Sequence, residues 1–388
     1  MYDQIREDTL FIIFYSIVTA IAMMASCYLL FRRANAIAPD ITPPAHLRRW
    51  AAAFLAALAL NHVWYMPIFF LSSNEDIRLC DLVGGLLDSM TLFPVAIIVL
   101  LTMLQDRRRP LWPIVVMMTP IVVVGAWSVV TRSYALLPMV YVYSLLMCMG
   151  LIIYMVRALR QYGRWLRDNF ADLEHKEVWQ SFVVLAIIML VFAIYVFASE
   201  GPVYQYAMQM IVLVLVCYLL WRVETLSDLN TKSTLEVSSV PLSRADDLRI
   251  DDLRCDSDDC ELSAIHADTA LLSFRNNIGP LLKQYCEEPQ LYLQYDISLS
   301  QLATLIGINR SYLSSHFASQ GVTYNAYING LRIQHFINLY HETATTHQPI
   351  TAQQLAYQSG FRSYSTFSAA FKQVMGMTAT EWMRLSES

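Results

Sequence analysis

Hydrophobic residues are distributed unevenly along the chain and divide it into two parts. Up to about Trp221, long apolar stretches alternate with short charged ones, whereas the remainder has the mixed composition of a soluble protein. A helix needs about 20 apolar residues to cross roughly 30 Å of hydrocarbon. Residues 1–222 are therefore predicted to form a transmembrane domain. Its seven spans are expected at about residues 9–31, 50–72, 82–104, 111–130, 134–156, 178–199 and 202–221.

The third predicted span contains an acidic residue, Asp88. A carboxylate inside a membrane is costly unless it is paired, protonated or hydrated, so such a residue is a candidate for function. Asn61 and His62 in the second span are candidate partners, and the three residues form a candidate sensor site. Alternatively, Asp88 lies near a membrane end, where it reaches the interface or caps a neighbouring helix.

Basic residues indicate the orientation of the spans, because short cytoplasmic loops are rich in Lys and Arg. The loops after the first, third and fifth spans carry twelve of these residues, against three on the other side (Arg6, Arg78 and Arg132). We therefore expect a multi-pass protein of the bacterial inner membrane, with its N-terminus outside and its C-terminus in the cytoplasm. The first apolar run is too long for a cleavable signal peptide, and acids precede it.

The overall composition limits which metal, cofactor and catalytic sites are expected. Of 388 residues, 56% are hydrophobic and 15% are charged, and the seven cysteines are scattered without zinc spacing. We therefore predict no metal, disulfide framework or cofactor. The spans also lack an HExxH motif, a Ser-His pairing and clustered acids, so an enzyme is not expected. Residues 223–264 are acidic and read as a flexible tether with a reach on the order of 35 Å.

Two similar helical patterns follow in residues 265–388, which are predicted to form a soluble domain. Ser298 or Ser300 can cap a helix that ends at Gly307, and Asn309 can cap the next, so a first helix-turn-helix is expected at about 299–319. A long amphipathic helix follows. The pattern then recurs 53 residues later around Gly360, with Thr351 and Ser363 as caps and Gly376 with Thr378 opening a last helix. The second helix-turn-helix is expected at about 351–374.

These patterns carry a family resemblance. The order and spacing of the two half-motifs resemble AraC/XylS-type transcription regulators, over about Leu281 to Arg384. The second half-motif reads Gly360-Phe361-x-Ser363-x-x-x-Phe367-x-x-x-Phe371-Lys372-x-x-x-Gly376-x-Thr378. The first reads Leu299-x-x-Leu302-Ala303, Gly307-x-Asn309-Arg310-Ser311-Tyr312-Leu313-Ser314 and Tyr327-Ile328-Asn329-x-x-Arg332-Ile333. The expected fold class is thus all-α: a seven-helix transmembrane bundle followed by a double helix-turn-helix domain.

The resemblance implies that double-stranded DNA is the partner, with two recognition helices in successive segments of the major groove. Short hydroxyl side chains can bond base edges but discriminate weakly, and an arginine can pair with guanine. Arg310 and Lys372 are expected near phosphate. The candidate DNA-binding residues are Asn309, Arg310, Ser311, Ser314, Ser315, Arg362, Ser363, Tyr364, Ser365, Ser368 and Lys372.

The charge of this domain departs from the family pattern. Residues 281–388 carry six Lys and Arg and six Asp and Glu, and Ala369 occupies a position that is often Arg. Because phosphate neutralisation supplies most non-specific affinity, one domain should bind DNA weakly. A homodimer would compensate through effective concentration.

Three functions are compatible with these patterns. The leading hypothesis is a one-component regulator, in which an unknown ligand or signal at the lipid-embedded domain changes DNA occupancy. The alternative is a membrane receptor or transporter-like protein whose helix-turn-helix tail docks a protein partner, which the neutral charge of the tail favours. A membrane enzyme is the least favoured.

Overall fold

The computed structural model is helical and comprises two compact units. The N-terminal unit contains Met1–Gly163 and His175–Leu229, and the C-terminal unit contains Arg164–Glu174 and Asn230–Ser388. The short stretch Arg164–Glu174 thus belongs to the C-terminal unit although it lies far from it in sequence. The structure describes residues 8–39, 41–107, 109–174, 176–187, 202–229, 278–346 and 351–386.

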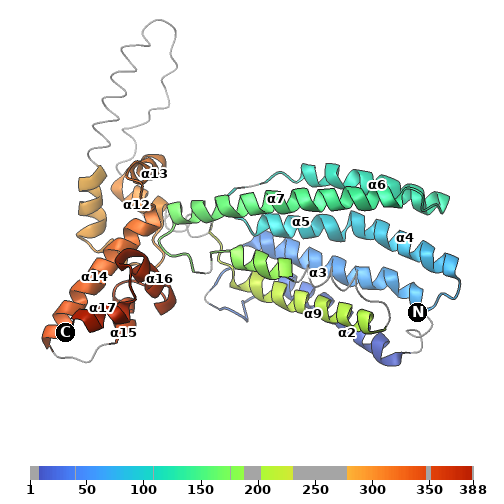
Figure 1. Cartoon of the computed structure of the whole chain (residues 1–388), viewed down its shortest axis with the longest axis horizontal. Coiled ribbons are helices and arrows are strands. Elements are labelled where there is room, and N and C mark those ends of the chain that lie inside the picture. The colour runs from blue at the N-terminus through green and yellow to red at the C-terminus, as the bar shows by residue number, and fades with distance from the viewer. Residues whose placement is uncertain are drawn as a thin grey trace, which may run out of the picture. The chain divides into compact units, whose positions relative to one another are not determined.

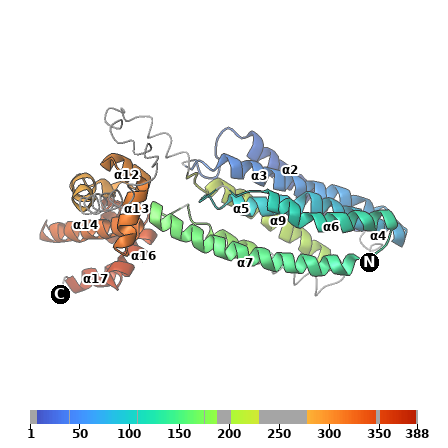
Figure 2. The ribbon, with the colours of Figure 1, turned by 90° about the horizontal axis from the view of Figure 1, so that it is seen from above.

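Long apolar helices build the N-terminal unit, and several lie side by side in both views (Figures 1 and 2). Among the described residues, six segments are long and apolar enough to cross a membrane, by length and composition: Thr9–Phe31, Ala45–Phe69, Asn74–Thr102, Trp112–Thr131, Leu137–Asn169 and Gln205–Thr225. The remaining predicted span, at 178–199, is described only as far as residue 187. The helices are α2 (Thr9–Phe31), α3 (Ala45–Tyr65), α4 (Asn74–Met90), α5 (Leu92–Thr102), α6 (Trp112–Thr131), α7 (Leu137–Asn169) and α9 (Pro202–Thr225).

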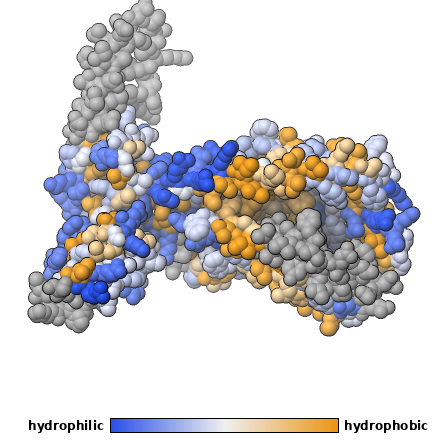
Figure 3. Space-filling model, viewed as in Figure 1, coloured by the Kyte–Doolittle hydropathy of each residue, from blue (hydrophilic) through white to orange (hydrophobic). Residues whose placement is uncertain are grey.

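The surface of these helices is apolar, as the orange residues of Figure 3 show. Large side chains on α6 and α7 face outward: Val130 is 82% exposed and Met139 is 70% exposed. Soluble monomers rarely expose contiguous apolar patches larger than a few hundred Å². This surface therefore suits a hydrocarbon environment.

The third predicted span is two helices rather than one. Helix α4 ends at Met90 and α5 begins at Leu92, with a non-helical conformation at Thr91 (φ −120°, ψ −68°). Pro94 accounts for the break, since a proline ring clashes with the carbonyl four residues earlier and removes a hydrogen bond. As a consequence, Asp88 lies in the last turn of α4.

Helices and helical turns make up most of the described part of the C-terminal unit outside Arg164–Glu174. The 3-10 turn η3 (Leu291–Leu293) and the π-helical turn η2 (Lys283–Glu287) precede the two helix-turn-helix pairs. The first pair is α12 (Leu299–Ile306) with α13 (Arg310–Ser319), then comes α14 (Tyr324–Thr346), and the second pair is α15 (Ala352–Gln358) with α16 (Tyr364–Met375), followed by α17 (Ala379–Ser386).

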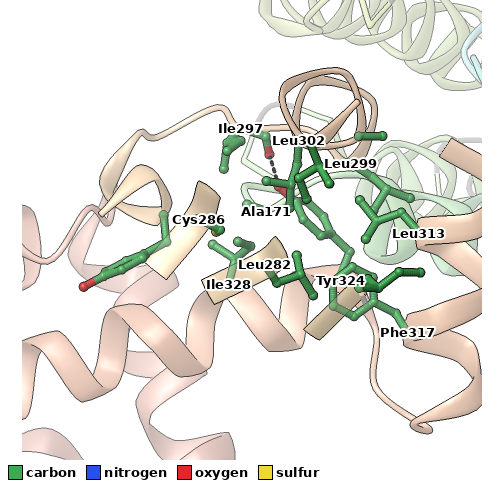
Figure 4. Close-up of a cluster of buried hydrophobic side chains, with 14 residues drawn as sticks. Ala171, Leu282, Cys286, Ile297, Leu299, Leu302, Leu313, Phe317, Tyr324 and Ile328 are labelled. Carbon is green, nitrogen blue, oxygen red and sulfur yellow. Dashed lines mark hydrogen bonds between the residues drawn. The ribbon is translucent and has the colours of Figure 1, made fainter. Parts of the chain in front are cut away.

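Helix α14 joins two hydrophobic cores. Its Tyr324 and Ile328 lie in the first core with the α12–α13 pair, whereas Ile333 and Phe336 lie in the second with the α15–α16 pair. A single rigid helix therefore links the two helix-turn-helix units. Figure 4 draws the first core, which also contains Ala171 from the stretch after α7.

Local signals in the sequence end and begin these helices as expected, with one exception. Ser298 and Thr351 each form a capping box, so the alternative cap Ser300 is wrong. Gly307 and Gly360 have positive φ values of 78° and 83°. Gly376, however, ends α16 with φ 76° rather than starting the last helix. Its lack of a Cβ suits this left-handed conformation.

Candidate nucleic-acid interface

Helix α13 turns its apolar side inward and its polar side outward. Leu313 and Phe317 are buried in the first core. Ser311 and Ser315 are exposed, and Ser314 is half-buried. The Asn309 side chain accepts a hydrogen bond from the Ser311 backbone N–H at 2.9 Å, so its oxygen serves as the helix cap. The α13 serines are thus available to a partner, while the Asn309 oxygen is already used.

Helix α16 has the same division. Phe367 and Phe371 are buried in the second core, and Ser365 and Lys372 are exposed. The other three predicted contacts on this helix are less open. Ser368 is half-buried, the Ser363 hydroxyl accepts from the Thr366 N–H as the helix cap, and Tyr364 packs its ring 5.6 Å from the Phe367 ring.

A buried arginine fixes the second helix-turn-helix to the first half of the domain. Arg332 in α14 is 1% exposed, and its guanidinium donates to the carbonyls of Tyr292 and Gln294, each at 2.7 Å. It also lies 5.6 Å from the centre of the Phe361 ring, within range of a cation–π interaction. Burial lowers the pKa of Arg332, while the charge of Asp172 opposes that shift.

Gly360 adds a second link between the halves. A Cβ at Gly360 would lie 2.7 Å from the Cα of Leu293 in η3, so only glycine permits this approach. Sequence reasoning placed Gly360 in the turn but missed the role of Arg332. The available signal was a charged residue among the apolar positions of a helix, which is rarely buried unless it is paired.

Two arginines predicted to contact DNA already have partners within the C-terminal unit. The Nε of Arg310 donates to the Asn169 Oδ1 at 2.9 Å, and Nη2 donates to the same oxygen. The Nη1 of Arg362 lies 3.7 Å from the Asp296 Oδ2. Arg310 and Arg362 both remain exposed at the surface. Both guanidinium groups are therefore accessible to a partner, although each already has a contact within the C-terminal unit.

The candidate sensor residues lie in the N-terminal unit and only partly come together. Asp88 is 7% exposed, and its two oxygens accept from the Asn61 amide at 2.9 Å. Trp64 and Tyr65 donate to the same carboxylate at 3.2 Å each. These donors lie at positions i, i+3 and i+4 of α3, one face of the helix. Sequence reasoning found Asn61 but missed the other two, although this spacing could have revealed them.

His62 has partners other than Asp88. Its Nδ1 lies 2.8 Å from the Leu58 carbonyl, and its Nε2 lies 3.0 Å from the Gln209 Oε1 in α9. These hydrogen bonds of His62 go to Leu58 and Gln209, because adjacent residues point to different faces of a helix, and a role of His62 beside Asp88 stays a prediction. Within the described ranges, no group of three or more His, Cys, Asp or Glu is arranged to hold a metal ion.

Comparison with known proteins bears on the C-terminal unit. Residues 302–385 match a family described as "Helix-turn-helix domain". The C-terminal unit carries an AraC-type helix-turn-helix domain. An uncharacterized HTH-type transcriptional regulator of Staphylococcus aureus strain MRSA252 is 31% identical over 102 residues, which are 26% of this chain and 13% of that protein. The AraC-type domain therefore has relatives among transcriptional regulators.

A second relative is a shorter protein than the first. The TCP pilus virulence regulatory protein of Vibrio cholerae is 37% identical over 75 residues, which are 19% of this chain and 25% of that protein. The matches thus span an eighth to a quarter of these relatives. No solved structure matches the chain. The AraC-type domain supports DNA binding in transcription regulation, and the apolar helices of the same chain are able to span a membrane.

Proposed function

We propose that the chain is a membrane-anchored, sequence-specific transcription regulator that acts as a one-component sensor. The observation that carries this proposal is the covalent union of two parts. One is a double helix-turn-helix with polar, outward-facing recognition helices, and the other is a set of six candidate spans. A signal at the N-terminal unit would change DNA occupancy by the AraC-type domain.

Orientation and tethering follow from the sequence. The excess of basic residues on one side of the spans favours a bacterial inner-membrane protein with the AraC-type domain in the cytoplasm. We take the range 178–199 as a seventh span. The predicted tether at 223–264 begins too early, because α9 runs to Thr225 and the N-terminal unit includes residues up to Leu229, so we take 230–264 as the tether. The apolar outer surface of the helices would be covered by membrane lipid.

Each recognition helix would supply a different chemistry to DNA. The hydroxyls of Ser311, Ser315 and Ser365 would meet base edges, where they accept or donate one hydrogen bond. Arg362 would pair with guanine or phosphate, and Lys372 would contact the backbone. Because the domain carries no net positive charge, affinity for any one duplex would be low. We therefore expect a homodimer on paired half-sites.

The cluster around Asp88 is the candidate sensor. Four donated hydrogen bonds hold its carboxylate inside the N-terminal unit, away from the AraC-type domain in sequence. A buried carboxylate is expensive to keep in a membrane and is sensitive to protonation or to loss of a donor. A change at this cluster would alter the packing of α3 against α4.

Selection from random duplexes tests DNA recognition directly. The full chain is used in lipid nanodiscs, because Ala171 belongs to the core of the C-terminal unit and a C-terminal fragment would lack it. We expect enrichment of a defined motif at low salt and weaker enrichment at moderate salt. Ser315→Ala and Arg362→Ala should change the motif or reduce enrichment, whereas Gln334→Ala, an exposed change in α14, should not.

Docking of a protein partner by the tail is the competing function. The balanced charge of residues 281–388 favours it, because DNA-binding domains are commonly basic. If no motif is enriched and Arg362→Ala leaves duplex binding unchanged, the DNA function is wrong. Enrichment of a motif that depends on Arg362 would exclude docking as the main role.

A further inference from the structure

The last residue of α7 and the three residues that follow it contact the first helix-turn-helix. Asn169 to Asp172 lie within the C-terminal unit. Phe170 forms an isolated antiparallel bridge with Ser298, the cap of α12. The Ala171 N–H donates to the Ile297 carbonyl at 3.3 Å. We call Asn169–Asp172 the docked segment.

A side chain of α14 holds the other edge of the docked segment. The Asn325 amide donates to the Phe170 carbonyl at 3.3 Å and to the Ala171 carbonyl at 2.5 Å. The polar backbone of the segment is thus bonded on both sides, as buried backbone groups require. Such pairing distinguishes a bound peptide from a loop that only passes the surface.

Burial shows that the docked segment is part of the core. Ala171 is fully buried in the cluster that contains Leu299 and Tyr324, as Figure 4 shows. Asp172 is 2% exposed, and its charge acts on the buried Arg332. A buried acid whose charge acts on a buried guanidinium offsets part of the desolvation cost of both. The segment is therefore anchored by packing and by charge.

Asn169 connects this anchored segment to the recognition helix. Its Oδ1 accepts from both Nε and Nη2 of Arg310, the first residue of α13. This pair of N–H groups forms one edge of the guanidinium fork that binds phosphate in a bidentate manner. Asn169 and a DNA phosphate therefore require the same donors. A phosphate oxygen carries a charge that the Asn169 amide lacks, so its Coulomb attraction to the guanidinium allows it to displace the amide.

We propose that the docked segment is an intramolecular ligand of the first helix-turn-helix that competes with DNA for Arg310. This inference rests on the proposed function and adds a mode of regulation to it. Release of Asn169 frees the Arg310 fork and raises affinity for DNA. Asn169 is also the last residue of α7, and α7 begins among the residues of the N-terminal unit. The docked segment is therefore continuous in sequence with that unit.

A mutant cycle in the full chain tests the competition. Asn169→Ala should tighten binding to a selected duplex by roughly three- to tenfold, the range expected when the part-buried hydrogen bonds from Arg310 to this amide no longer compete with DNA. Arg310→Ala should weaken binding, and the double variant should match Arg310→Ala alone. Asn338→Ala, an exposed asparagine in α14, is the matched control and should leave the Kd unchanged.

Hydrogen exchange tests the docking without reference to DNA. The Ala171 amide should be protected in the free chain, and a saturating duplex should speed its exchange or that of Phe170. Exchange of Ala171 at the rate of a free peptide would overturn the docked segment. If Ala171 is protected but Asn169→Ala binds DNA no more tightly than the wild type, the competition is wrong. The docked segment would then only support the structure of the first helix-turn-helix.

Failure of the proposed function gives a different result. If neither the wild type nor any variant binds a duplex, DNA binding and the competition are both wrong. Protection of Ala171 in the same samples would still establish the docked segment. The two measurements thus separate an error about DNA from an error about the segment.

Discussion

Arg362, at the start of the second recognition unit, lies 3.7 Å from Asp296 in the turn that leads into the first. The next two residues of this turn, Ile297 and Ser298, hold the docked segment. The turn at residues 296–298 therefore contacts Arg362 of the second helix-turn-helix and the docked segment that binds the first helix-turn-helix. A change at either contact is positioned to affect both halves of the AraC-type domain.

Removal of the Asp296 charge should strengthen DNA binding. The variant Asp296→Asn frees Arg362 and removes a negative charge close to the expected phosphates. We expect a two- to fivefold lower Kd, in the range of a partly exposed ion pair. The change in Kd is measured by titration of a selected duplex at several salt concentrations.

The control for this prediction is Arg362→Ala. In that background, Asp296→Asn should have a smaller effect, because the ion pair is already absent. An equal effect in both backgrounds would show that Asp296 acts only through long-range repulsion. Thermal stability should change little, since exposed ion pairs contribute only about 0–1 kcal/mol.

Cys286 should be inert while the C-terminal unit is folded. Its side chain is fully buried in the first core, and burial raises the pKa of the thiol to about 12. Alkylation requires the thiolate, so iodoacetamide at pH 8 should not label this residue in the native chain. Peptide mass spectrometry measures the labelling.

Urea provides the control for Cys286. The thiol should become reactive in the denaturant concentration range where the unit unfolds, because the unfolded pKa is close to 9. Rapid labelling in native buffer would contradict the burial of this core. Labelling that precedes global unfolding would report local opening around η2.

Substitution of Gly360 should damage the second unit more than the equivalent change damages the first. Gly360→Ala and Gly307→Ala both place a Cβ on a residue with positive φ, at a cost of about 1–3 kcal/mol each. Gly360→Ala also forces a Cβ to 2.7 Å from the Leu293 backbone, whereas no atom lies within 4 Å at Gly307.

Hydrogen exchange of α16 and α13 amides compares the two glycine variants. We expect faster exchange in α16 for Gly360→Ala than in α13 for Gly307→Ala. Equal effects would mean that the backbone of Leu293 moves aside without cost. That outcome would contradict a tight join between η3 and the second helix-turn-helix.

Asp88→Asn should alter the output of the proposed sensor without changing the intrinsic DNA affinity. Asparagine offers one acceptor oxygen in place of two, so the donors from Asn61, Trp64 and Tyr65 are no longer all satisfied. A promoter reporter in cells measures output, and titration of the purified chain measures affinity. Asp81→Asn, an exposed change on the same helix, is the control.

The result decides whether Asp88 belongs to the sensor. A change in reporter output for Asp88→Asn but not for Asp81→Asn supports a sensing role. Unchanged output for both variants would leave Asp88 as a structural acceptor. Loss of the protein from the membrane would be seen by immunoblotting, and Tyr65→Phe then removes a single donor as a milder change.

Short-range features were determined by the sequence alone. Apolar runs located the long helices that are the six candidate spans among the described residues, and Ser298, Thr351 and Ser363 located helix starts, because capping depends on residues within three positions of each other. The positive φ at Gly307 and Gly360 follows from the lack of a Cβ. Even the break before α5 has a local cause in Pro94, although the apolar pattern by itself predicts one continuous span at about 82–104.

Only the tertiary structure decided which distant residues meet. Asn169 and Arg310 are 141 positions apart, and Arg332 bonds carbonyls about 40 positions away. Neither contact leaves a periodic signal, since each depends on how whole helices pack. The burial of Ala171 in the first core and the hydrogen bonds that several α3 side chains donate to Asp88 also depend on how whole helices pack. A side chain's neighbours across the fold are set by the sum of many packing contacts, which no short window of sequence contains.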